Sequence, residues 1–160
     1  MILKFKRLQI KIFVKILEKR VGLCSQKETR EDKHILLWDF DNSKLVNIVK
    51  TLKRLQIKYK LPAIFLVKSS PFSYHAYSFT ARPFREVIHI LSDTPQVDMT
   101  YLRMGMVRGY YTLRITSRKN EGIFSLERLL PSIIKEEMDK SGMMINEYLT
   151  SNKGGHDAKG

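Results

Sequence analysis

The sequence predicts a single α+β domain with a ferredoxin-like antiparallel sheet, in which the helices pack on one face. The chain has 160 residues, which suits one domain. From residue 34 onward, apolar runs of strand length and segments of helical periodicity follow in the order strand–helix–strand–strand–helix–strand. We expect the domain to cover residues 34–149. A basic segment and connector (1–33) precede it, and a disordered tail (150–160) follows.

The first half of the predicted domain contains a strand, a helix and a hairpin. The apolar run from Ile35 to Phe40 is typical of a buried strand. A helix is expected next, ending before Pro62, because apolar residues recur at spacings of three and four: Leu45, Ile48, Val49, Leu52 and Leu55. Two further strands, Ala63–Val67 and Tyr74–Phe79, flank a Ser/Pro turn and therefore predict a hairpin.

The second half is predicted from shorter signals. A second helix should begin near Pro83 and continue through Leu91. Residues 99–105 and 109–116 predict one or two more strands, and Pro131 suits the first turn of a closing helix. Residues 1–20 alternate as a strand does, but their lysine spacing also allows a basic amphipathic helix.

The charge balance indicates a polyanionic partner. The chain has 29 Lys and Arg against 16 Asp and Glu, a net charge of +13. Such an excess favours nucleic acid or nucleotides, because neutralising phosphates releases counterions. An anionic membrane surface would attract the same charge. The single cysteine, Cys24, excludes an intrachain disulfide and a multi-cysteine zinc site, and it fits a reducing compartment. No run approaches the ~20 apolar residues of a membrane span, so we expect a cytoplasmic protein without a membrane span.

Two carboxylates at the end of the first strand are the strongest catalytic candidates. Asp39 and Asp41 alternate along the strand and should therefore share one face of the sheet. Two converging carboxylates are typical ligands for the Mg²⁺ or Mn²⁺ of phosphoryl transfer. The alternative is that Asp41 caps the following helix and Asp39 is simply a polar residue. Asp98 is the candidate for a third carboxylate.

Two further groups of residues have the chemistry for phosphate binding. His75 lies in the third strand after small serines, including Ser73, that would let a phosphate approach the backbone. A buried histidine satisfied by its aromatic neighbours is the alternative interpretation. A basic segment follows, in which arginines would bind phosphates and tyrosines would stack on bases: Arg103, Arg108, Tyr110, Tyr111, Arg114, Arg118 and Lys119. A solvated basic edge strand would have the same composition.

In this order the motifs resemble those of the archaeo-eukaryotic primase superfamily, the primase-polymerases. The matching residues are Leu37-Trp38-Asp39-Phe40-Asp41, Ser73-Tyr74-His75 and Val97-Asp98, followed by Leu113-Arg114-Ile115 and Lys119. The resemblance covers roughly residues 34–120. It implies that Asp39, Asp41 and Asp98 bind a divalent metal. It also implies that His75 contacts the triphosphate of the incoming nucleotide, with Ser73, Arg114 and Lys119 as further phosphate contacts.

Three functions are compatible with this pattern. The leading hypothesis is a reduced replication protein with a primase-polymerase core that transfers nucleotides on a nucleic-acid template. The second is a non-catalytic binder of single-stranded DNA or RNA, which needs only the sheet, the basic segment and four aromatic residues: Tyr74, Tyr77, Tyr110 and Tyr111. The third is a subunit of a larger nucleoprotein assembly that docks through residues 1–20, with four apolar anchors: Ile2, Leu3, Phe5 and Phe13.

Overall fold

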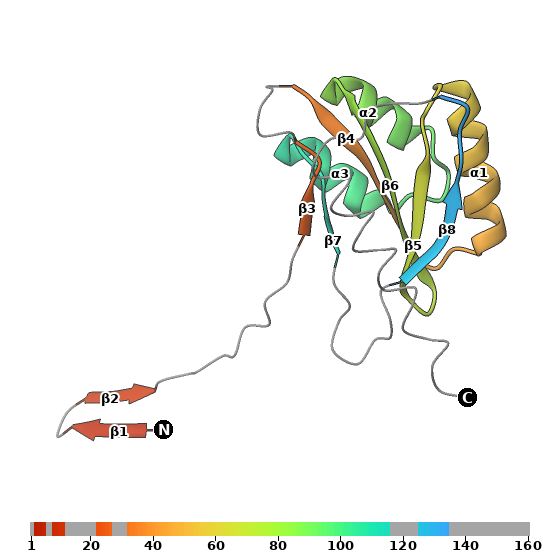
Figure 1. Ribbon diagram of the computed structural model, residues 1–160. Coiled ribbons are helices and arrows are strands. Elements are labelled where there is room, and N and C mark those ends of the chain that lie inside the picture. The colour runs from red at the N-terminus through yellow and green to blue at the C-terminus, as the bar shows by residue number, and fades with distance from the viewer. Residues whose placement is uncertain (1, 6–7, 12–21, 27–31, 116–124, 135–160) are drawn as a thin grey trace, which may run out of the picture.

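The computed structural model describes residues 2–5, 8–11, 22–26, 32–115 and 125–134 (Figure 1). The strands are β1 (Ile2–Phe5), β2 (Leu8–Lys11), β3 (Gly22–Cys24), β4 (His34–Phe40), β5 (Ile64–Ser70), β6 (Ser73–Arg82), β7 (Thr112–Arg114) and β8 (Ser125–Leu130). The helices are α1 (Leu45–Lys58), α2 (Phe84–Ser92) and α3 (Met99–Arg108). The predicted tail (150–160) lies beyond the described residues. Pro131 was expected in the first turn of a closing helix, but residues 131–134 are not helical, and the rest of that segment lies beyond the described residues.

The predicted α+β class with antiparallel sheets is confirmed. The main sheet has four strands in the order β4-β6-β5-β8, and each neighbouring pair is antiparallel. The elements β4, α1, β5, β6 and α2 follow one another as the sequence pattern predicts. The sheet ends with β8, which pairs with β5. The strand expected near residues 109–116 is the short β7, which pairs with β3 in a separate two-stranded sheet.

The strand predicted over residues 99–105 is wrong, because this segment forms α3. Asp98 precedes the helix, and its side chain accepts a hydrogen bond from the amide of Tyr101, which satisfies a free donor of the first turn. The helix ends at Gly109, whose positive φ of 80° is the left-handed conformation that favours glycine. Terminal capping therefore outweighs the strand preference of Thr100 and Tyr101.

The hydrophobic core has buried residues on both faces of the main sheet, and one of its layers lies between the sheet and helices α1 and α2. Trp38, Ala76 and Leu66 lie opposite one another on β4, β6 and β5 and are fully buried. The Trp38 indole donates a hydrogen bond of 3.2 Å to the hydroxyl of Thr94, just after α2, so this face of the sheet lies against α2. The other face, which carries Asp39 and His75, is therefore directed away from α2.

A short segment at residues 22–26 joins the β3–β7 pair to the main sheet. The Ser25 amide donates to the Tyr111 carbonyl and the Ile35 amide donates to the Ser25 carbonyl, each at 2.8 Å. Figure 1 shows β3, β7 and α3 together on the side of β4, whereas α1 lies toward β8. This segment belongs to the sequence stretch expected to be a connector.

The described residues near the N-terminus form a two-stranded sheet. Of the two conformations considered for residues 1–20, the described parts form strands, since β1 pairs with β2 in an antiparallel register from Ile2–Lys11 to Phe5–Leu8. None of the helices in the described part of the chain is long and apolar enough to cross a membrane.

Candidate functional site

The candidate site begins with a cross-strand pair. Asp39 on β4 lies directly opposite His75 on β6, and both side chains point to the face of the sheet away from α2. The distance from His75 Nε2 to Asp39 Oδ1 is 3.6 Å. The Asp39 side chain is 24% exposed, whereas that of His75 is only 5% exposed. The carboxylate is therefore accessible at this point, while the imidazole lies behind it.

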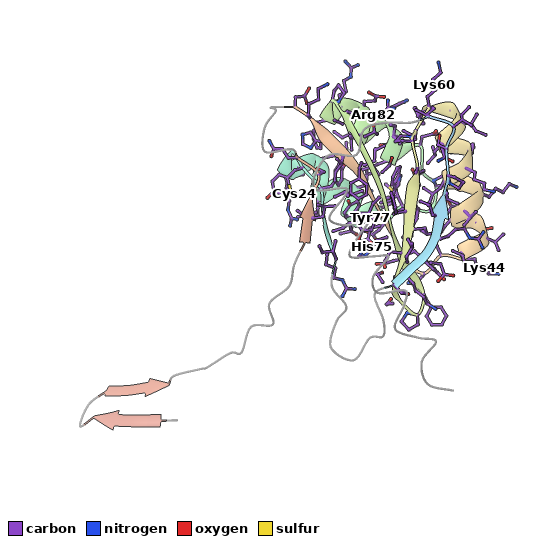
Figure 2. All side chains as sticks on the ribbon, viewed as in Figure 1. Cys24, Lys44, Lys60, His75, Tyr77 and Arg82 are labelled. Carbon is purple, nitrogen blue, oxygen red and sulfur yellow. The ribbon has the colours of Figure 1, made fainter. Side chains whose placement is uncertain are left out.

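His75 also belongs to a buried polar chain that includes Tyr77, and Figure 2 labels both residues. Its Nδ1 lies 3.2 Å from the hydroxyl of Tyr77, two residues along the same strand, and this hydroxyl donates to the Arg114 carbonyl at 3.2 Å. Burial, with the nearby Arg114 charge, lowers the pKa of His75 to about 4. Burial also raises the pKa of Tyr77 far above its ordinary value. His75 is therefore a neutral imidazole at neutral pH, and Tyr77 keeps its proton.

Asp98 is fixed beside the same pair by backbone and side-chain contacts. Its amide donates a 2.9 Å hydrogen bond to the Asp39 carbonyl, while its carboxylate caps α3. In the first turn of α3, the Tyr101 hydroxyl donates to the Leu37 carbonyl at 3.1 Å. These contacts attach the beginning of α3 to the end of β4. Asp39, His75 and Asp98 therefore lie at one place although they come from three separate segments.

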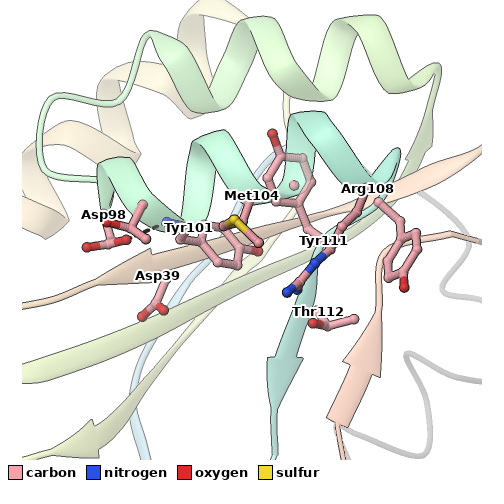
Figure 3. Close-up of a pocket in the computed structure, with 10 residues that line it drawn as sticks. Asp39, Asp98, Tyr101, Met104, Arg108, Tyr111 and Thr112 are labelled. Carbon is pink, nitrogen blue, oxygen red and sulfur yellow. Dashed lines mark hydrogen bonds between the residues drawn. The ribbon is translucent and has the colours of Figure 1, made fainter.

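A cleft with a volume of about 240 Å³ runs from this place along α3. It is lined by Asp39, Asp98, Thr100, Tyr101, Met104, Gly105, Arg108, Tyr110, Tyr111 and Thr112. Figure 3 shows the two carboxylates at one end, Arg108 toward the other, and Tyr101 and Met104 between them. The cleft thus has an acidic end and a basic end.

The predicted site residues are only partly brought together. Asp41 is exposed one residue beyond β4, and Ser73 is half-buried at the start of β6. The members of the basic segment differ in exposure. Three are exposed, namely Arg103, Arg108 and Tyr110, whereas Arg114 is half-buried and Tyr111 is buried. Arg118 and Lys119 lie outside the described residues. Of the four tyrosines proposed to stack on bases, Tyr74, Tyr77 and Tyr111 are buried, and Tyr110 is 37% exposed.

The acidic end has the chemistry to hold a magnesium or manganese ion together with a phosphate. Within the described residues, no three His, Cys, Asp or Glu side chains are grouped closely enough to hold a metal ion by themselves. Mg²⁺, however, is commonly held by one or two carboxylates, with substrate phosphates and water as the remaining ligands. Asp39 and Asp98, which line the same cleft, fit that mode of binding.

Sequence reasoning missed the residues that α3 contributes to the cleft. Thr100, Tyr101 and Met104 line it, and all three lie in the segment expected to be a strand. One signal in the sequence could have predicted the helix. Asp98 directly precedes the segment Met99–Arg108 and Gly109 directly follows it, which is typical of a helix with an N-cap and a terminal glycine.

Comparison with protein-family models, with curated proteins and with solved structures finds no match for this chain. A functional conclusion therefore has to come from the geometry of the cleft and from the charge of the chain.

Proposed function

We propose that the protein transfers nucleotides to a nucleic-acid hydroxyl at the acidic end of the cleft, in a metal-dependent, primase-polymerase-like reaction. One observation supports this proposal above the others. The three motifs that resemble a primase-polymerase lie far apart in the sequence, yet Asp39 and Asp98 line one cleft and His75 lies against Asp39. The net charge of +13 is consistent with polyanionic substrates.

In this proposal the carboxylates hold Mg²⁺ or Mn²⁺. Asp39 and Asp98 bind the ion from the cleft walls, and Asp41, exposed next to the end of β4, is available as a further ligand. When bound, the ion neutralises phosphate charge and lowers the pKa of the attacking hydroxyl. His75 is the phosphate contact that the resemblance implies. Because the Tyr77 hydroxyl donates to the Arg114 carbonyl, the ring proton of the neutral imidazole lies on Nδ1, and contact of Nε2 with a phosphate oxygen would require the imidazolium form. Ser73, Arg114 and Lys119 are the further phosphate contacts that the resemblance implies.

The proposal is tested by nucleotide incorporation. The full chain is incubated with primed and unprimed single-stranded templates, labelled nucleotides and Mn²⁺, alongside the Asp39→Asn, Asp41→Asn double variant. We expect synthesis by the wild type, loss of synthesis in the double variant, and unchanged or tighter oligonucleotide binding. Glu127→Gln, which removes an exposed carboxylate from β8, is the matched control and should keep full activity. Equal synthesis by the wild type and the double variant would exclude these carboxylates from the reaction.

A non-catalytic binder of single strands is the second candidate. It is favoured by the Asp98 carboxylate, which already has a structural role as the cap of α3. This candidate predicts oligonucleotide binding that is sensitive to salt, unaffected by EDTA, and not accompanied by synthesis. The burial of Tyr74, Tyr77 and Tyr111 leaves Tyr110 as the accessible stacking residue among the four proposed.

Docking on a partner through residues 1–20 stays a prediction. Phe13 lies outside the described residues, and Ile2, Leu3 and Phe5 belong to β1. Deletion of residues 1–20 with full retention of assembly would contradict it.

A further inference from the structure

The end of the cleft opposite Asp39 and Asp98 contains an arginine that the proposed reaction does not use. Arg108 ends α3 and lines the cleft together with Met104, Tyr110 and Thr112. We propose that this end binds one nucleotide unit of a single-stranded nucleic acid. Arg108 contacts its phosphate, and the adjacent base lies against Met104 and Tyr110. The inference rests on the proposed function, because it places a strand in the cleft that holds the catalytic carboxylates.

The ion pairs of the chain distinguish Arg108 from the structural cations. Arg54 and Lys58 on α1 pair with Asp93, and Arg82 pairs with Glu86. In the part of the chain that the structure describes, no carboxylate forms an ion pair with Arg108. The sequence of α3, MTYLRMGMVR, contains two arginines and no acidic residue. The planar guanidinium of Arg108 is therefore available to bind a phosphate through two parallel hydrogen bonds.

The apolar residues beside Arg108 provide a surface for a base. Met104 is 43% exposed and Tyr110 is 37% exposed, although both are large side chains. A tyrosine ring stacks on any nucleobase, and the flexible methionine adapts to bases of different shape. The buried Tyr111 forms the wall behind them, and its hydroxyl donates to the Leu102 carbonyl at 3.2 Å. A cation next to an exposed aromatic is the combination that single-strand binding sites use.

The size and polarity of the cleft favour a single strand. A cleft of about 240 Å³ is far too small for a duplex, so a single strand is the form of nucleic acid that could enter it. The two ends of the cleft have opposite charge (Figure 3). A strand whose phosphate is bound at Arg108 can therefore direct its next nucleotide toward the carboxylates. An acidic peptide would satisfy Arg108 but would gain little from a stacking surface.

The test is oligonucleotide binding in the absence of metal. A fluorescently labelled single-stranded oligonucleotide is titrated with the full chain in EDTA, and the anisotropy is followed at several salt concentrations. Arg108→Gln is compared with Arg128→Gln, which removes an exposed arginine from β8 at the far edge of the sheet. We expect Arg108→Gln to weaken binding about tenfold and to reduce the slope of log K against log salt by about 0.7, the share of one phosphate contact. Arg128→Gln should change affinity less than about twofold.

A second pair of variants tests the base surface. Tyr110→Ala should weaken binding about fivefold or more, whereas Tyr110→Phe, which keeps the ring, should bind as the wild type does. Equal effects of Arg108→Gln and Arg128→Gln would overturn the inference, because binding would then depend on overall charge alone. Preferential binding of a poly-glutamate peptide through Arg108 would overturn it as well.

The binding assay and the synthesis assay separate the strand-binding site from the proposed catalytic function. If Arg108→Gln and Tyr110→Ala weaken binding while no condition gives synthesis, the strand site exists and the catalytic proposal fails. If the wild type synthesises while Arg108→Gln binds like Arg128→Gln, the catalytic proposal survives and the strand site does not.

Discussion

His75 on β6 and Asp39 on β4 face each other across the strand pair, with Nε2 and Oδ1 3.6 Å apart. Burial and the Arg114 charge lower the pKa of His75 to about 4, and they outweigh the opposing effects of a hydrogen bond with the Arg114 backbone and of the Asp41 charge. The pair therefore combines a neutral imidazole with a partly exposed carboxylate.

The buried imidazole makes the fold sensitive to acid. In the unfolded chain His75 binds its proton near pH 6.5, and in the folded chain only near pH 4. The free energy of unfolding is therefore unaffected by His75 above pH 6.5 and falls as the pH decreases from 6.5 to 4. The largest loss is on the order of 3 kcal/mol. His34, whose pKa is lowered by burial, should add to the same trend.

Urea unfolding between pH 7.5 and 4.5 measures this effect. The dependence of stability on pH should be smaller in His75→Gln than in the wild type. His89→Gln, which replaces an exposed histidine on α2, is the control for the loss of a histidine at the surface. If His75→Gln and the wild type lose stability in parallel, the imidazole is not buried in its neutral form.

Asp98 has a structural role and a proposed metal-binding role, and two substitutions separate them. Asp98→Asn keeps a good N-cap for α3 and removes the charge, so stability should change by less than about 0.5 kcal/mol while nucleotide incorporation is lost. Asp98→Ala removes both the N-cap and the charge, and it should lower the free energy of unfolding by about 0.5–2 kcal/mol. Urea unfolding and incorporation assays on both variants give the comparison. An active Asp98→Asn variant would leave Asp98 only its role as a cap.

Local periodicity predicts much of this fold, whereas tertiary contacts decide the rest. The helix α1 and the β5–β6 hairpin follow directly from apolar spacing and from the turn between the two strands. The conformation of residues 99–108 does not, because strand-forming residues such as Tyr101 compete there with capping by Asp98 and Gly109. The pairing of β7 with β3 depends on a contact between distant segments that no local pattern encodes.

The candidate site, too, is predicted in part by local sequence pattern and in part decided by tertiary contacts. The sequence places Asp39 and His75 in strands, but their direct opposition requires the register between β4 and β6. Asp98 reaches Asp39 because the segment after α2 returns to the end of β4, which is a property of the folded chain. Burial of Tyr77 could not be predicted either, because an aromatic residue on an alternating strand suits either face.

Ser25 connects three segments through one buried hydroxyl. Its Oγ accepts a 2.9 Å hydrogen bond from the Tyr111 amide and lies 3.0 Å from Nδ1 of the buried His34. Ser25→Ala would leave both groups without this partner, at a cost of about 1–3 kcal/mol for each group that stays unsatisfied. Thermal or urea unfolding should therefore show a large loss of stability, whereas Ser92→Ala, at an exposed position at the end of α2, should have little effect. A loss as small as that of Ser92→Ala would mean that other groups replace the hydroxyl.

Gly105 provides the space that Tyr111 occupies, so the effect of alanine there should depend on the residue at position 111. A Cβ added at Gly105 would overlap the Tyr111 ring. Both residues are buried and line the cleft. Gly105→Ala should therefore lower the free energy of unfolding by about 1–3 kcal/mol through overpacking, although alanine favours a helix interior.

With Tyr111→Ala the ring is absent, and the same Gly105→Ala change should stabilise the chain by up to about 1 kcal/mol. The sign of the effect thus reverses between the two backgrounds in urea unfolding. Stabilisation by Gly105→Ala in the wild-type background would mean that the Tyr111 ring does not lie against α3, and the wall of the cleft would have to be placed elsewhere.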